Sequence, residues 1–171
     1  RDNQKRFLDS VEYAATVNVS FKIPIGTLKG IACVAVPFCE NSVISEYTNE
    51  ELKGISSNGK TLVNVGLHEG AAREIIGKSN EEIFSFVKGE LLKVCPPLKG
   101  NASLLENHDL ERWPAAMPKF SQRFVDEAIR FWQRGQGENG VYLAGDMTGC
   151  PWVEGAIYSG KKVAKLIEGS I

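Results

Sequence analysis

The stretch YAATVNVSFKIP, residues 13–24, alternates apolar and polar side chains along its whole length. A period of two is typical of a half-buried strand, because successive side chains of a strand point to opposite faces. The apolar positions that would share one face are Val17, Val19, Phe21 and Ile23. A second alternating run, TLVNVGLHEGAA (61–72), follows the turn sequence SSNGK, whose Asn58-Gly59 pair suits a tight hairpin. Together these stretches predict antiparallel strand pairing.

Further elements follow from shorter signals. Two apolar segments, 30–37 and 42–47, are strand candidates, the first of them as a central strand. Ser79 and Glu82 form a capping-box pattern, and apolar residues then recur at helical spacing until Pro96-Pro97. Residues 103–118 are expected to be extended, and a second helix is expected over 122–134. Strands followed by helices predict an α+β fold, a mainly antiparallel sheet with flanking helices, plus a C-terminal strand-loop-helix.

The composition is that of an ordinary globular protein, with 43% hydrophobic and 24% charged residues. The formal net charge of −1 gives no global field that would favour nucleic acid or an anionic membrane. No apolar run approaches the ~18 residues of a membrane span, and the N-terminal residues do not form a signal peptide. The four cysteines include no C-x-x-C pair, so zinc is not indicated. Their even count permits two disulfides, but reduced thiols in the cytoplasm are the better expectation.

The stretch VYLAGDMTGCPWVEGAIYSGKKVAKLI, residues 141–167, combines a short apolar strand, a Gly-Asp pair and a helix expected to begin at Pro151. Gly145 would let a ligand approach the backbone, and Asp146 offers two acceptor oxygens to hydroxyl groups. The first helical turn, from Trp152 to Glu154, would present free N–H groups and a positive pole to an anion or a polarised carbonyl oxygen. A row of small residues would let this helix pack closely: Ala156, Gly160 and Ala164. A strand, a tight turn and a packed helix without a ligand is an equally good interpretation.

This stretch resembles the C-terminal FAD-binding motif of the flavin-containing amine oxidase superfamily, which includes monoamine oxidases, protoporphyrinogen oxidase and the phytoene-desaturase-like enzymes. The matching residues are Gly145, Asp146, Pro151, Glu154, Gly155, Ala156, Ser159 and Gly160. The segment RWPAAMPKF, residues 112–120, resembles the exit from the substrate-binding domain in the protoporphyrinogen-oxidase and desaturase-like branches. The G-x-G-x-x-G motif that opens the superfamily's Rossmann unit does not occur, and the sequence starts at Arg1 rather than at methionine. The expectation is therefore a C-terminal piece of a longer flavoprotein.

The resemblance implies two segments: 1–136, part of the substrate-binding domain, and 137–171, the C-terminal FAD-binding segment. The residues implied to hold FAD in the parent are Gly145, Asp146, Pro151, Trp152, Val153, Glu154 and Ala156. Trp113 and Trp152 are candidates to line the substrate cavity, and core packing is an equally good interpretation of each. No catalytic residue and no metal ligand is assigned. Glu154 is disfavoured as a base, because a carboxylate in a first helical turn also simply complements the helix dipole.

The expected parent is an FAD-dependent oxidoreductase that oxidises a C–N or C–C bond of a small molecule by hydride transfer to flavin. It would be cytoplasmic, or peripheral to a membrane. The chain by itself is expected to lack the N-terminal Rossmann half that is its partner. It is therefore expected to be inactive and to bind FAD weakly or not at all. It is also expected to self-associate through the open edges of strand 141–144. The alternative is a non-catalytic α+β binding module for an apolar ligand or a protein partner.

Overall fold

The computed structural model describes residues 2–169, and the chain divides into two compact units. Unit 1 is assembled from both ends of the chain, Arg1–Ala14 and Ala115–Ile171, and unit 2 from the continuous stretch Ala15–Pro114. The predicted division after residue 136 falls inside unit 1. The assignment of the two predicted segments to substrate binding and FAD binding stays a prediction.

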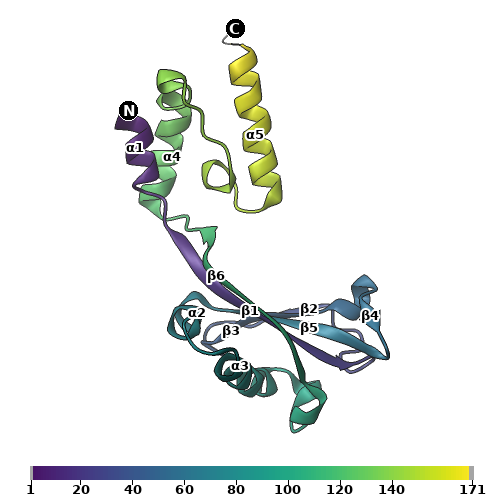
Figure 1. Cartoon of the computed structure of the whole chain (residues 1–171). Helices are drawn as coiled ribbons and strands as arrows, with labels where there is room; N and C mark the ends of the chain where they lie inside the picture. Colours follow the sequence, from purple (N-terminus) through teal and green to yellow (C-terminus); the bar gives the residue numbers. More distant parts are fainter. Residues whose placement is uncertain (1, 170–171) are drawn as a thin grey trace. The chain divides into compact units, whose positions relative to one another are not determined.

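Unit 2 is built on a six-stranded sheet (Figure 1). Its strands, in spatial order, are β2 (Cys33–Ala35), β3 (Ile44–Asn49), β5 (Lys60–Leu67), β1 (Tyr13–Pro24) and β6 (Glu106–Pro118), with β4 (Ser56–Ser57) paired to β5. β5 pairs antiparallel with β1, β3 and β4, and β2 pairs antiparallel with β3. Asn58 and Gly59, at φ 51° and 73°, form the hairpin turn between β4 and β5. The predicted antiparallel sheet is confirmed.

The alternation of β1 gives the sheet its buried face. Val19 lies opposite Val65 and Phe21 opposite Val63, and all four side chains are fully buried. Helices α2 (Glu69–Ile75) and α3 (Asn80–Val94) cover this face on one side of the sheet (Figure 1). Each large apolar side chain that moves out of water here contributes roughly 1.5–3 kcal/mol. The capping box predicted before α3 is present in full, from Ser79 to Glu82.

Two predictions for unit 2 were wrong. The run 61–72 is not one strand, because β5 ends at Leu67 and α2 begins at Glu69, where it buries Ala72 and Ile75. The strand predicted at 30–37 is only the three residues of β2, and it lies at the edge of the sheet rather than in its centre. The apolar character of that run has another cause, since Ile31 and Val36 pack onto the core from outside the strand.

Within the described residues, unit 1 contains the α-helices α1 (Asp2–Leu8), α4 (Gln122–Arg134) and α5 (Val153–Glu168). Its core is aromatic, and the rings of Phe7 and Phe131 stack with their centroids 4.5 Å apart. The extent of α4 confirms the prediction, whereas the sequence gave no sign of α1. Short 3₁₀ turns complete the chain: η1 (Glu50–Lys53), η2 (Pro96–Leu98), η3 (Ala102–Leu104), η4 (Glu138–Gly140) and η5 (Asp146–Thr148). Over the described residues no helix has the length and apolarity to span a membrane.

Candidate functional site

Residues 141–144, predicted as a strand, pair with no strand within residues 2–169, so this prediction was wrong. The backbone of Leu143 pairs instead with the side chain of Gln136, whose Nε2 donates to the carbonyl oxygen at 2.6 Å and whose Oε1 accepts from the N–H at 3.0 Å. Gln4 Nε2 likewise donates to the carbonyl oxygen of Val141 at 2.9 Å. Two amide side chains thus make hydrogen bonds that a neighbouring strand would make.

Gly145 follows in a conformation that only glycine adopts readily, with φ 143° and ψ 178°. Its N–H donates to Ser159 Oγ at 2.9 Å, and its carbonyl oxygen accepts from Thr148 Oγ1 at 2.9 Å. Ser159 is completely buried in α5, so it fixes this peptide to the helix. An added Cβ at Gly145 would meet no atom within 4 Å, which leaves open space beside the backbone, as an approaching ligand requires.

Asp146 begins the turn η5, and its Oδ1 accepts from the N–H of Met147 at 2.8 Å. The carboxylate also accepts a hydrogen bond from the Tyr13 hydroxyl. Burial raises the pKa of Tyr13, and the charge and hydrogen bond of Asp146 raise it further. Asp146 remains partly exposed, so its other lone pairs can accept hydroxyl groups of a ligand. The sequence did not predict the contact with Tyr13.

Helix α5 begins at Val153 and not at Pro151, which corrects the predicted start. The reason lies at Gly155, where a Cβ would stand 1.8 Å from the carbonyl oxygen of Cys150. The chain before the helix therefore packs against its first turn and does not extend the helix through Pro151. Trp152 is the N-cap at φ 91° and ψ 167°, a backbone conformation that is strained for any residue other than glycine. The free first-turn N–H groups therefore belong to residues 153–155.

The buried side of α5 consists of Gly155, Ser159 and Val163, one position before the predicted row of small residues that starts at Ala156. The side chains of Trp152 and Val153 are 73% and 72% exposed. Glu154 is exposed in the first turn.

Trp113 lies on β6 in unit 2 and Trp152 in unit 1, and neither is a core residue of its unit. Their role in lining a substrate cavity stays a prediction, and so does the binding of FAD by the predicted residues.

An apolar groove of about 430 Å³ runs between α4 and α5. Phe120, Ile129 and Tyr158 line it with side chains that are 46%, 53% and 66% exposed. At its edge the ammonium group of Lys162 lies 3.9 Å from the centroid of the Trp132 ring. Large contiguous patches of exposed apolar surface mark sites of interaction with a protein or a ligand.

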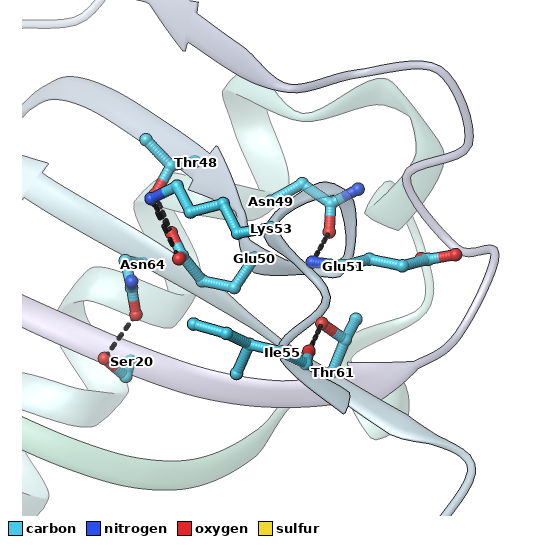
Figure 2. Close-up of polar contacts among 9 residues, drawn as sticks. All are labelled: Ser20, Thr48, Asn49, Glu50, Glu51, Lys53, Ile55, Thr61 and Asn64. Carbon is cyan, nitrogen blue, oxygen red and sulfur yellow. Dashed lines mark hydrogen bonds and ion pairs between the residues drawn. The ribbon is translucent and has the colours of Figure 1, made fainter. Parts of the chain in front are cut away.

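Unit 2 contains a buried carboxylate, Glu50, that the sequence does not predict (Figure 2). Glu50 is 4% exposed, and its Oε1 accepts from Thr48 Oγ1 at 2.7 Å and from Lys53 Nζ at 2.9 Å. Burial raises the pKa of Glu50, but the hydrogen bonds from Lys53 and Thr48 and the Lys53 charge outweigh it and hold this pKa below its usual value. Glu50-Glu51 follows a strand and has the pattern of a solvated turn, so the sequence carries no sign of this burial. No group of three or more His, Cys, Asp or Glu in the described chain could hold a metal ion.

Comparison with known proteins agrees with this architecture. The chain resembles the crystal structure of a candidate protoporphyrinogen oxidase from Exiguobacterium sp. 255-15, with a TM-score of 0.72 and 18% identity over 96% of this chain and 36% of that one. It also resembles the PF1083 protein from Pyrococcus furiosus, with a TM-score of 0.56 and 16% identity over 96% of this chain and 34% of that one. At these identities the likeness shows the fold, and the chain spans about a third of either structure.

No curated protein is significantly similar in sequence to this chain. The sequence profile of the flavin containing amine oxidoreductases, in contrast, matches residues 10–167. That match covers all of unit 2 and, within unit 1, residues 10–14 and 115–167. The chain therefore belongs to the flavin-containing amine oxidoreductase family.

Proposed function

We propose that this chain is the C-terminal part of an FAD-dependent oxidoreductase that oxidises a C–N or C–C bond of a small molecule by hydride transfer to flavin. One observation carries the proposal, namely the backbone between Gly145 and Val153. It contains a glycine at φ 143° and a tryptophan at φ 91°, on either side of a short loop that begins with a carboxylate. Such conformations cost of order 1–3 kcal/mol each for a residue other than glycine, and they cluster where a ligand is bound.

The residues in this loop fit the polar parts of FAD. Asp146 supplies acceptor oxygens suited to the hydroxyl groups of the ribityl chain or the ribose. The first-turn N–H groups of α5 form the positive end of a helix of 16 residues, which suits a polarised carbonyl oxygen that gains negative charge. The open space beside Gly145 allows close approach to the backbone. Bound flavin would supply the hydride acceptor, and this chain would orient it and stabilise its charge.

We also propose that unit 1 pairs with an N-terminal Rossmann half. The similar solved structures are about three times as long as this chain, and the dinucleotide-binding motif is absent from the sequence. The groove between α4 and α5 gives such a half an apolar surface to cover. Without it, the chain would bind FAD weakly, show no turnover, and leave the groove open to a second copy.

We propose a cytoplasmic location, or a peripheral membrane location for the parent. The four cysteines support the cytoplasm, because all of them are free.

The test uses both the full-length parent and the chain as described. The parent should purify with bound flavin, and Asp146→Ala should lower its flavin content at least tenfold, since a charged hydrogen bond is worth about 1.5–3 kcal/mol. Asp9→Ala is the matched control, because Asp9 is exposed in the same unit and lies outside the loop. Residues 1–171 alone should quench FAD fluorescence only weakly.

Three results would contradict these proposals. A colourless parent that binds no added FAD would leave the non-catalytic binding module as the better function. Tight FAD binding by the chain alone would show that the Rossmann half is not required. A stable dimer of the parent that buries the groove would show that a second copy covers it.

A further inference from the structure

We propose that unit 2 has a binding site for a small organic carboxylate with an apolar body, in the cavity beside the β4–β5 hairpin. This cavity has a volume of about 490 Å³, which is within the usual range for small-molecule sites. All of its lining residues belong to unit 2, so the site is distinct from the loop of unit 1 proposed to hold flavin.

The charged side chains around the cavity favour a ligand that carries one negative charge. Lys22 and Lys60 contribute two ammonium groups, Glu106 contributes one carboxylate, and His108 lines the same space. Lys60 forms an ion pair with Glu106, but both side chains are about half exposed, and such pairs are weak. Over the described residues Lys22 makes no hydrogen bond or ion pair, although its charge acts on Glu106. The cavity therefore offers one uncompensated ammonium group.

The cationic and protonatable side chains around the cavity lie close enough to Glu106 to act on its charge. The pKa of Glu106 lies below its usual value, first because Lys60 donates a hydrogen bond to it and contributes its charge. Lys22 and His108 lower this pKa further. A ligand carboxylate that enters the same space would meet the same three cationic or protonatable side chains.

The remaining lining suits an apolar body with a polar end. Ile55 is 48% exposed at the cavity, and Leu62 lies opposite Lys22 in the sheet. Hydroxyl and amide groups for further hydrogen bonds come from Ser56, Ser57 and Asn58. An apolar wall beside a small set of polar groups is the usual form of a ligand site.

This wall is held in place by the buried Glu50 cluster (Figure 2). The N–H of Ile55 donates to the carbonyl oxygen of Glu50 at 3.1 Å, and Thr61 Oγ1 donates to the carbonyl oxygen of Ile55 at 2.7 Å. Ser56 and Ser57 then pair with β5. Because Glu50 is fixed by Thr48 and Lys53, the wall is ordered before a ligand arrives.

The experiment titrates the full chain with octanoate and, in parallel, with octanol, and follows backbone amide signals by NMR. Octanoate should shift the amides of residues 55–62 and 106–108 in a saturable way, and octanol should bind at least tenfold more weakly. Lys22→Met should weaken octanoate binding about tenfold, because it removes one charged hydrogen bond and keeps the apolar stem. The matched control is Lys93→Met, since Lys93 lies on α3 and does not line the cavity.

Equal affinities for octanoate and octanol would show that the cavity binds only the apolar body of the ligand, and this would overturn the proposal. Equal effects of Lys22→Met and Lys93→Met would also overturn it, as would shifts confined to other regions. His108→Gln serves as a second variant, because His108 is an exposed residue of β6 that lines the cavity, and it should also weaken octanoate binding. None of these outcomes depends on flavin, which the protein does not need for this measurement.

Discussion

The contact between Gly155 and Cys150 leads to a sharp prediction about two glycines of one helix. A methyl group added at Gly155 would stand 1.8 Å from the carbonyl oxygen of Cys150 and 2.6 Å from its carbonyl carbon. A methyl group added at Gly160 would meet no atom within 4 Å. The same substitution should therefore have opposite effects at positions five residues apart on α5.

The magnitudes follow from two terms. Alanine in place of glycine favours a helix by about 0.8–1.0 kcal/mol, and both variants gain this term. At Gly155 backbone atoms must also move apart, and overpacking of this kind costs typically 1–3 kcal/mol or more. Gly160→Ala should thus stabilise unit 1 by about 1 kcal/mol. Gly155→Ala should be less stable than Gly160→Ala by roughly 1–3 kcal/mol or more, which is about a 5- to 150-fold difference in the opening equilibrium.

Amide hydrogen exchange in α5 is the suitable assay, because it reports on the unit that carries the substitution. Amides from Ala156 to Val163 should exchange faster in Gly155→Ala and more slowly in Gly160→Ala, each relative to the original protein. If the two variants protect α5 equally, the chain before the helix does not press against its first turn, and the explanation for the late helix start fails.

Three further predictions concern single side chains. Trp152→Gly should be more stable than Trp152→Ala by about 1 kcal/mol, because both variants lose the indole side chain and only glycine tolerates φ 91°. This is the reverse of the usual order, in which alanine is the more stabilising residue. Equal urea midpoints of the two variants would show that the backbone at this position is unstrained. The pKa of Glu50 is lowered in the folded protein, so its stabilising contribution is present above the unfolded pKa of about 4.3 and is lost as pH falls through the folded pKa. Glu50→Gln should lower the free energy of unfolding at pH 7 and reduce the decrease of this free energy at acid pH. An unchanged dependence of the free energy of unfolding on acid pH would contradict this. Asp146→Asn should lower the pKa of Tyr13 toward its ordinary value, since the neighbouring charge is removed. NMR titration of the tyrosine ring carbons measures this pKa, and Tyr13→Phe identifies the signal. An unchanged pKa of Tyr13 would show that the two side chains are apart.

The sequence predicted the elements in which a local pattern and the tertiary structure agree. The alternation in β1 is clear because one face of that strand is buried and the other is not. The capping box and apolar spacing of α3 are equally local signals. Helices α1 and α2 have seven residues each, too few to be stable alone, so tertiary packing decides them and no local pattern reveals them.

The candidate site was predictable only in part. Glycine and aspartate at a strand-to-helix connection identified Gly145 and Asp146, but not the partners that fix them. Ser159 contacts Gly145 from the second turn of α5, and Tyr13 contacts Asp146 from the other end of the sequence. The apolar run 141–144 is typical of a strand, and only the structure shows that Gln136 takes the place of the neighbouring strand. Single side-chain contacts of this kind leave no periodic pattern in the sequence.

The discontinuous build of unit 1 has a consequence for how the protein is made. Residues 2–14 are synthesised before unit 2, yet the partners of Phe7 on α4 are synthesised only after all of unit 2. During that interval Phe7 lacks its partners on α4, while residues 15–114 can already fold. Translation pauses and chaperone access before residue 115 should therefore affect the yield of folded unit 1 far more than that of unit 2.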